Sequence, residues 1–228
     1  MKYKEEIKLA FKVSIPVFMG YSILGFAFGL LMVSLNYDIL IPIVMSIFIY
    51  AGALQFLAIG FFSAKLALFD IFIASLFVNI RQSFYGLSVL DKFKDTSNLK
   101  PYLVFALTDE TYGLITSIKE EKNINQKFYY FFLSLFNQFY WVLGTTLGAI
   151  FASYISFDTK GLEFSLTALF VVLAIEQYKV NKNYIPFLLG AVSSIIAILF
   201  IPISNMLISS IIFSIILLFI FKSKIINE

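Results

Sequence analysis

The chain contains no cysteine and no histidine, which excludes several kinds of chemistry before any motif is considered. Without thiols there are no disulfides, thiolate metal sites or cysteine nucleophiles. Without imidazole there is no histidine-ligated metal site, and any proton relay must use Asp, Glu or Lys. No nucleophile–base pair, phosphate-binding loop or metal-ligand set is recognisable in the sequence. We therefore expect neither a cofactor nor enzymatic activity.

Charge is also scarce, and apolar residues take its place along most of the chain. Charged residues make up 14% of the 228 residues and hydrophobic residues 60%, against roughly 25% and 45–50% in ordinary soluble domains. A soluble fold would have to expose much of this apolar surface to water, which is not tolerated. The net charge of +3 indicates no nucleic acid partner. We therefore expect an all-α, polytopic bundle of transmembrane helices in the lipid bilayer of the cell membrane.

The apolar runs predict about eight spans within a single integral membrane domain, residues 1–228. About 20 residues cross the hydrocarbon core, so the chain has no room for a separate soluble domain. Segment 101–118 is the weakest span because two acidic residues lie within it. The alternative there is a re-entrant or broken helix, and seven spans is the alternative count. The expected spans are residues 13–35, 39–61, 66–90, 101–118, 128–154, 163–178, 184–201 and 204–221.

The positions of the lysines test this count through the positive-inside rule. With a cytoplasmic N-terminus, eight spans place twelve lysines on the inner side and four on the outer side. Without the span at 101–118, the lysines between residues 119 and 127 would lie outside, against the rule. We therefore expect eight spans with both ends of the chain in the cytoplasm.

An internal repeat is one interpretation of the glycine pattern. Gly25 and Gly29 in the first span recur 119 residues later as Gly144 and Gly148, and the run 53–56 has a looser counterpart at 167–170. Repeats are common in secondary transporters, but glycine is also frequent in membrane helices for packing alone. With an even number of spans, such a repeat would be parallel.

Three charged residues lie near the middle of predicted spans: Arg81 in the third, and Asp109 and Glu110 in the fourth. A charge at the centre of a membrane helix costs about 2.5–3.5 kcal/mol on insertion scales, so it usually has a function. We expect Arg81 to pair with one carboxylate while the other faces a different surface, since adjacent helical residues point about 100° apart. Because there are two acids and one base, one negative charge remains after pairing, and a proton or a substrate ammonium would neutralise it. The alternative is an ion pair that only fastens two helices.

Asn79, Gln55 and Tyr85 complete the candidate residues for substrate binding or coupling. Helical spacing places Asn79 with Gln82 on one face of the third span and Tyr85 with Arg81 on another. Gln55 is a deep amide beside small residues that permit close backbone approach. Amides in membrane helices often serve only as interhelical hydrogen bonds, so core bonding and lining a substrate cavity are both open for Gln55.

At these residues the chain resembles the AzlC family, also called the YgaZ type, the large subunit of branched-chain amino acid exporters. The resemblance covers about residues 12–200, with the motifs in the family's order. The family usually reads Asn-Leu-Arg-His where this chain has Gln82 at the last position, which argues against a histidine in coupling. The matching stretches are residues 50–56, 79–88, 108–111, 141–148 and 161–170.

The resemblance implies a transporter that exports valine, leucine, isoleucine or methionine together with a small AzlD-like membrane subunit. The absence of a nucleotide site favours secondary transport, with a proton as the expected coupling ion. A zwitterionic substrate needs an acceptor for its ammonium, which Asp109 or Glu110 would supply. Its carboxylate needs donors, which Arg81 and the amides of Asn79 and Gln55 would supply. The alternative is a non-transporting membrane scaffold or regulatory subunit in which the charges are only structural.

Overall fold

The computed structural model describes residues 3–64, 66–117, 124–154, 183–202 and 206–222, together with 171, 174, 175 and 178. All regular structure in these residues is helical, and they contain no strand. The expected all-α class is therefore confirmed. The chain divides into two compact units, Met1–Gly60 with Phe77–Lys160 and Phe61–Leu76 with Gly161–Glu228. A single membrane domain stays a prediction.

Most of the expected spans contain a helix, and the first helix begins earlier than expected. Helix α1 (Lys4–Ser34) starts nine residues before the segment expected at 13–35. The segment expected at 163–178 lies almost entirely outside the described residues. The helices at 66–90, 128–154, 184–201 and 204–221 are α4 (Leu68–Ser88), α7 (Gln126–Tyr154), α9 (Ile185–Phe200) and α10 (Met206–Ile220).

Only α1, among the described helices, is both long and apolar enough to cross a membrane by itself. Three shorter apolar helices cover Gly52–Phe62, Ile185–Phe200 and Ser209–Ile220. Length and composition thus support one full span in the described part of the chain, and the count of eight spans stays a prediction.

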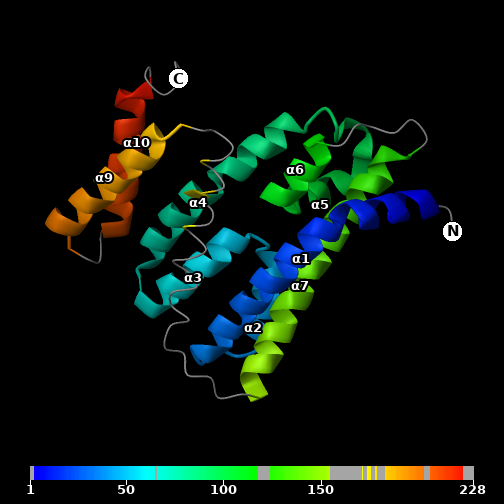
Figure 1. Cartoon of the computed structure of the whole chain (residues 1–228), viewed down its shortest axis with the longest axis horizontal. Helices are drawn as coiled ribbons and strands as arrows, with labels where there is room; N and C mark the ends of the chain where they lie inside the picture. Colours follow the sequence, from blue (N-terminus) through cyan, green and yellow to red (C-terminus); the bar gives the residue numbers. More distant parts are fainter. Residues whose placement is uncertain are drawn as a thin grey trace. The chain divides into compact units, whose positions relative to one another are not determined.

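Two of the expected spans are each made of two shorter helices (Figure 1). Segment 39–61 forms α2 (Leu40–Phe48) and α3 (Gly52–Ala64), so the expectation of one continuous helix there is wrong. Segment 101–118 forms α5 (Lys100–Phe105), which follows the 3₁₀ helix η1 (Lys94–Leu99), and α6 (Asp109–Ser117). Its broken-helix alternative is therefore the one observed.

The first interruption is caused by the backbone of Tyr50, which has a φ of 44°. This left-handed conformation is uncommon outside glycine and does not continue a right-handed helix. The N–H groups of Ile49 and Tyr50 both donate to the Met45 carbonyl oxygen, at 2.9 and 3.2 Å, and close the end of α2. Helix α3 then starts at Gly52. No proline or polar residue marks Tyr50 as a break, so the apolar sequence reads as one continuous span.

The second interruption ends where Thr108 starts α6. The Thr108 carbonyl oxygen accepts from the Tyr112 N–H at 2.8 Å, and its Oγ1 atom accepts from the Thr111 N–H at 3.4 Å. Threonine is a favoured residue at this capping position because its side chain satisfies an otherwise unpaired N–H group. Asp109 and Glu110 occupy the first turn, where the positive end of the helix dipole stabilises carboxylates.

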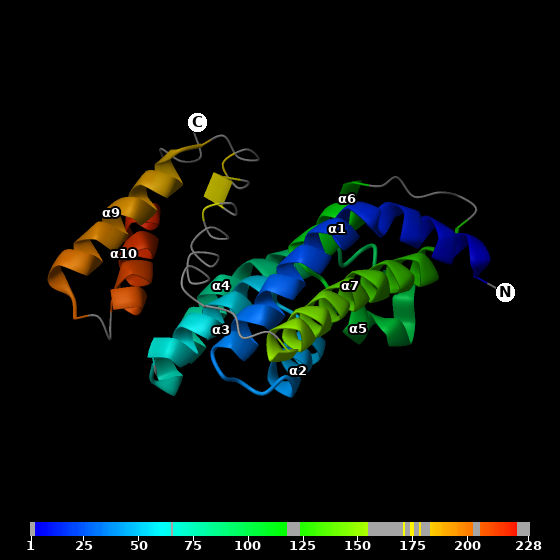
Figure 2. The ribbon, with the colours of Figure 1, turned by 60° about the horizontal axis from the view of Figure 1, so that its bottom comes forward.

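Helices α1 and α7 lie side by side and run parallel, as Figures 1 and 2 show. Near their N-terminal ends the rings of Tyr3 and Phe128 stack with centroids 3.8 Å apart. Further along, the hydroxyl groups of Ser14 and Tyr140 share a hydrogen bond of 3.0 Å. Parallel helices must have an even number of membrane crossings between their starts. This orientation is the one that the predicted topology requires of its first and fifth spans.

Glycine allows α1 and α7 to approach until their backbones touch. A Cβ atom added to Gly148 would overlap the Phe26 carbonyl oxygen, and one added to Gly25 would lie 2.7 Å from the Trp141 carbonyl oxygen. The glycines at this crossing are the four that recur in the sequence, Gly25, Gly29, Gly144 and Gly148. Helix packing therefore accounts for their recurrence. The counterpart run at 167–170 lies outside the described residues, and the internal repeat stays a prediction.

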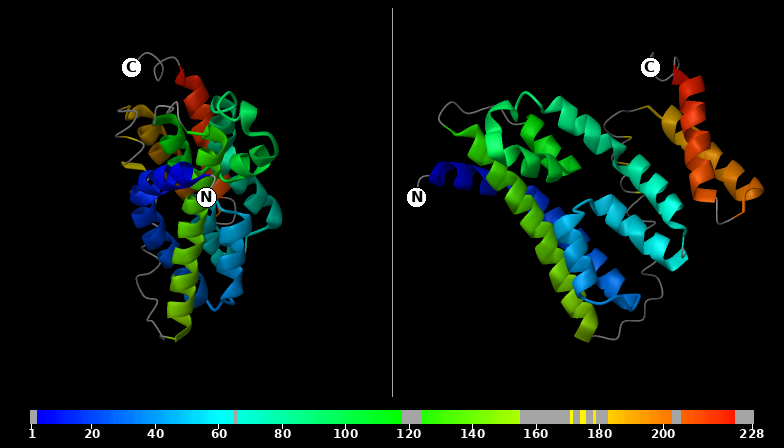
Figure 3. Two further views of the ribbon diagram at one scale, coloured as in Figure 1. Left: turned by 90° about the vertical axis from the view of Figure 1, so that its right-hand side faces the viewer. Right: turned by 180° about the vertical axis from the view of Figure 1, so that it is seen from behind.

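Helices α9 and α10 of the second unit pack against each other as a hairpin (Figure 3). Large apolar side chains on both helices are exposed, with Phe200 at 76% and Phe219 at 73%. Exposed apolar surface of this kind is typical of helices that contact lipid or another membrane helix.

Replacing Gly148 with Ala should destabilise the protein. Helix propensity alone favours Ala over Gly by about 1 kcal/mol, whereas overlap with the Phe26 backbone should cost about 1–3 kcal/mol. The expected result is a lower Tm, measured by thermal unfolding of the purified protein in detergent. Gly20→Ala in α1 is the matched control because a Cβ atom there meets nothing within 4 Å. A Tm for Gly148→Ala equal to that of the control would contradict this packing.

Candidate functional site

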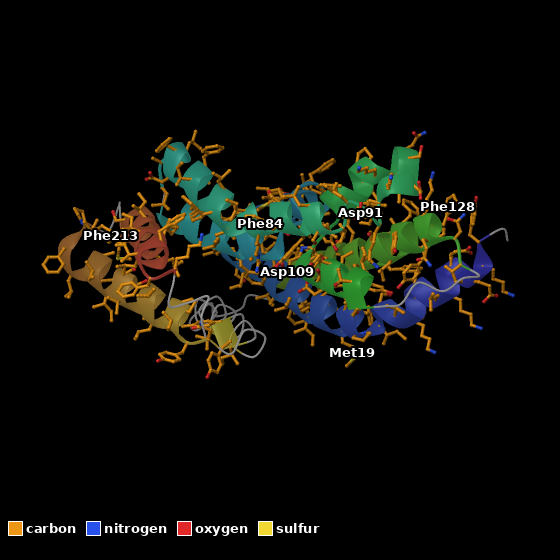
Figure 4. The ribbon with its side chains drawn as sticks, turned by 90° about the horizontal axis from the view of Figure 1, so that it is seen from above. Met19, Phe84, Asp91, Asp109, Phe128 and Phe213 are labelled. Atoms are coloured by element: carbon orange, nitrogen blue, oxygen red, sulfur yellow. The ribbon has the colours of Figure 1, made fainter. Side chains whose placement is uncertain are left out.

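Arg81 and Asp109 form an ion pair, as the sequence predicts. The Arg81 Nη2 atom lies 2.8 Å from Asp109 Oδ2, and each side chain is 33% exposed. Arg81 comes from α4 and Asp109 from the first turn of α6, and Figure 4 marks Asp109 where the ribbons of α4, α6 and α1 come together. Arg81 Nε and Asp109 Oδ1 are buried and have no hydrogen-bond partner among the described residues. The ion pair thus leaves one donor and one acceptor unsatisfied among the described residues.

Glu110 contacts a different helix from the one that Asp109 contacts, as their angular separation on α6 predicts. The buried Tyr21 hydroxyl of α1 donates to Glu110 Oε2 at 2.6 Å. Glu110 as a whole residue is exposed. The two adjacent carboxylates therefore have distinct environments, one beside a guanidinium and the other beside a phenol.

A chain of buried polar groups continues from Tyr21 into the interior. The Tyr21 hydroxyl lies 2.7 Å from Thr108 Oγ1, which lies 3.0 Å from Thr111 Oγ1. Asn137 Nδ2 of α7 donates to Thr111 Oγ1 at 2.9 Å. Thr111 and Asn137 are fully buried, and the Asn137 Oδ1 atom has no partner in the described part of the chain. The hydrogen bonds in this chain connect α1, α6 and α7.

Tyr50 brings the first helix interruption against the second. Its side chain is buried, and its ring centroid lies 6.3 Å from that of Phe105 at the end of α5. Its hydroxyl lies near Tyr21 and Thr108 and interacts electrostatically with Glu110. This hydroxyl makes no hydrogen bond of acceptable geometry to any described residue. The two interruptions therefore meet around Tyr21, beside Glu110.

Gln55 belongs to a second buried cluster, in which both ends of its amide are used. Trp141 Nε1 donates to Gln55 Oε1 at 2.9 Å, and Gln55 Nε2 donates to Ser46 Oγ at 3.1 Å. Ser46 Oγ donates in turn to Thr145 Oγ1 at 2.9 Å. The amide links α2, α3 and α7 across the first interruption. Of the two alternatives for Gln55, this geometry supports hydrogen bonding between helices rather than contact with a substrate.

Tyr85 lies one helical turn after Arg81 and beside Asp109. Its ring stacks on Tyr112 of α6 with centroids 4.4 Å apart, so it also packs α4 against α6. Asn79 is half-buried on α4, and its spacing of two residues places it on a different side of the helix from Arg81. The structure therefore brings Arg81, Tyr85, Asp109 and Glu110 together, with Asn79 nearby on α4.

Nothing in the sequence marks Tyr21 or Asn137 as a member of this site. Tyr50 begins the stretch 50–56 that resembles the family, but that resemblance gives its side chain no role. The chain has 13 tyrosines, and Tyr21 does not differ from the others in its sequence surroundings. Asn137 lies within a long apolar and aromatic run and reads as a helix-packing amide. Thr108 did carry a signal, because a threonine directly before two acidic residues is typical of a helix start.

Trp141 is the only tryptophan of the chain, so its fluorescence reports on the Gln55 cluster. Gln55→Leu should remove the acceptor of the indole N–H and leave that group buried without a partner. We expect the emission maximum to shift to shorter wavelength, with a loss of stability of about 1–2 kcal/mol. Gln82→Leu on α4 is the control with an amide outside this cluster. Identical emission from Gln55→Leu and the wild type would contradict the assigned hydrogen bond.

Comparison with known proteins places this arrangement in a family. The model of the family described as AzlC protein matches residues 16–155, which include every residue of both clusters. A Helicobacter pylori relative, described as an uncharacterized membrane protein, is 39% identical over 97% of both chains. The branched-chain amino acid transport protein AzlC of Bacillus subtilis is 39% identical over 79% of this chain and 71% of its own. The inner membrane protein YgaZ of Escherichia coli is 28% identical over 81% and 79%. No solved structure matches the chain.

Proposed function

Because the chain belongs to the AzlC family of membrane proteins, we propose that it is the large subunit of a proton-coupled exporter of branched-chain and other hydrophobic amino acids. A relative of similar length in Bacillus subtilis is named as a branched-chain amino acid transport protein. In this proposal the chain crosses the cell membrane about eight times and works with a small AzlD-like membrane subunit. The parallel orientation of α1 and α7 supports that topology.

The observation that carries the proposal is the ion pair between Arg81 and Asp109. A free amino acid presents an ammonium and a carboxylate, and these two side chains carry the complementary charges. When the site is empty, the side chains compensate each other, which lowers the cost of holding both at membrane depth. Each also keeps a buried, unpartnered atom, Arg81 Nε and Asp109 Oδ1, with which a substrate can bond. Tyr85 and Tyr112 provide aromatic surface beside the pair.

The two interrupted helices are a second support for a transport function. Many secondary transporters bind substrate and coupling ions near the bilayer midplane, where discontinuous helices leave helix ends inside the protein. Here α2 with α3 and α5 with α6 are interrupted at positions that meet beside the charged residues. The start of α6 carries two acids, so one negative charge remains after the ion pair is formed. That charge is available to a substrate ammonium or a proton.

The alternative function is a membrane scaffold in which Arg81 and Asp109 only fasten α4 to α6. If fastening were the only role of this pair, the protein would be more stable with every buried polar atom of the pair hydrogen-bonded. Each buried group without a partner costs about 1–3 kcal/mol of folding free energy. The two unpartnered atoms therefore favour a site that binds a ligand.

Replacing Asp109 with Asn, or Arg81 with Lys, should abolish export and leave membrane insertion unchanged. Asn keeps the shape but loses the charge, and Lys cannot reproduce the planar donor geometry of the guanidinium. Cells that express each variant are loaded with a leucine-containing dipeptide, and retained free leucine is measured with and without the small subunit. Asp91→Asn is the control because Asp91 is exposed after the end of α4. Normal efflux from both variants would refute the assignment.

The double variant Arg81→Asp with Asp109→Arg separates substrate binding from fastening. It restores an opposite pair between α4 and α6 but reverses the direction of the charges. An exporter that binds its substrate with these side chains should stay inactive in the same assay. Recovery of efflux by the double variant would assign the pair to fastening alone.

A further inference from the structure

We propose that Glu110 is the carboxyl that carries the coupling proton, and that a chain of buried hydrogen bonds transmits its charge state from α6 to α7. This inference rests on the proposed export function and specifies where the proton of that transport cycle binds. The members of the chain after Glu110 are Tyr21, Thr108, Thr111 and Asn137.

The first step is the unequal compensation of the two adjacent acids. Asp109 is paired with Arg81 at 2.8 Å, and this is the ion pair that the structure records for either residue. Glu110 instead accepts a hydrogen bond from the neutral phenol of Tyr21, so a hydrogen-bond dipole stabilises its negative charge. The ionisable groups that face it are Tyr21 of α1, Tyr50 of the first interruption, its neighbour Asp109 and Arg81 of α4. Of the two acids, Glu110 is therefore the one whose charge is not compensated by an ion pair in the described part of the chain.

The exposure of Glu110 allows its proton to be exchanged with water. One carboxylate oxygen accepts the hydrogen bond from Tyr21, while the side chain as a whole is exposed. A proton taken from hydronium at this carboxylate gives a neutral acid, and its return to water restores the charge. The step breaks no bond within the protein and changes the charge of the site by one.

The proton of the Tyr21 hydroxyl points to Glu110 when that residue is charged. Each hydroxyl has a single proton to donate, and the Tyr21 hydroxyl is placed as the donor toward both Thr108 and Glu110. Its proton goes to the carboxylate, because a charged acceptor makes the stronger hydrogen bond. At the other end of the chain, Asn137 Nδ2 donates to Thr111, and Thr111 can then donate to Thr108.

Protonation of Glu110 reverses this arrangement. With a proton on Oε2, the carboxyl becomes the donor to Tyr21, and the Tyr21 proton is then donated to Thr108. Thr108 in turn donates to Thr111. At the far end Thr111 then needs an acceptor, but the Asn137 amide presents Nδ2 to it. The Oδ1 atom of the same amide is buried and has no partner among the described residues. Rotation of the Asn137 amide by half a turn would supply that acceptor. Protonation of Glu110 on α6 would thus change the conformation of Asn137 on α7.

Difference infrared spectroscopy of the full-length protein in lipid nanodiscs tests the proton site directly. We expect a protonated-carboxyl band that disappears as the pH rises, is absent from Glu110→Gln and persists in Asp109→Asn. A band that persists in Glu110→Gln, or a wild-type protein without any titrating band, would overturn the assignment.

Tyr21→Phe tests the chain, because it removes the hydroxyl and keeps the ring that packs on Trp141 at 5.3 Å. Loss of this donor should move the pH midpoint of the band upward by about one unit, a tenfold change in proton affinity. Tyr102→Phe is the matched control, since its hydroxyl donates to Gln138 outside the chain. Equal midpoints for Tyr21→Phe and the wild type would refute the chain, because a packing role alone does not move the midpoint.

The outcomes separate this inference from the export function. If the Arg81 and Asp109 variants lose export while Glu110→Gln keeps the band, the exporter stands and the proton site is wrong. If the wild-type protein exports no amino acid, the proposed function fails. In that case a Glu110 that titrates would still bind a proton, but there would be no amino acid export for that proton to drive. The inference would then be wrong together with the proposed function.

Discussion

The hydrogen bond between Tyr21 and Glu110 joins three parts of the structure that meet beside the charged residues. Tyr21 lies on α1, which packs along α7 through glycine contacts, and its ring meets the edge of Trp141 at 5.3 Å. Its hydroxyl contacts both the carboxylate of Glu110 and the capping residue Thr108. The long parallel helix pair, the second helix interruption and the Trp141–Gln55 cluster therefore converge on one side chain. A substitution of Tyr21 should therefore alter the packing of all three parts.

The low polarity of a bilayer explains why so many buried hydroxyl and amide groups are needed here. Backbone groups freed by a helix interruption must be satisfied within the protein. Thr108 serves the start of α6, and the amide of Gln55 ties α3 to α7 next to the first interruption. The acids in the first turn of α6 gain from its dipole, and Arg81 compensates one of them. Interruption and charge thus stabilise each other, because the helix end favours the acids and the acids favour the helix end.

The sequence predicts the helical class and the charged pair, but not the geometry that joins the two interruptions. Apolar runs locate helices because their composition is unlike that of soluble proteins, and the rarity of buried charge singles out Arg81, Asp109 and Glu110. The break at Tyr50 depends on a left-handed backbone that tertiary contacts impose on an apolar run. The position of Gln55 away from the ion pair depends on how α3 packs on α7. Neither is encoded in local periodicity, so neither could be read in advance.

In the proposed export function, the start of α6 lines a water-accessible site that binds an amino acid within the membrane. The chain has no cysteine, so each introduced cysteine is a single reporter. Gly113 lies one turn after Asp109, and a Cβ atom there meets nothing within 4 Å. Gly113→Cys should react with a charged thiol reagent, and leucine should slow that reaction, whereas Ile23→Cys, on the exposed apolar side of α1, should not react. A reaction at position 113 that leucine leaves unchanged would contradict an amino acid site at the start of α6.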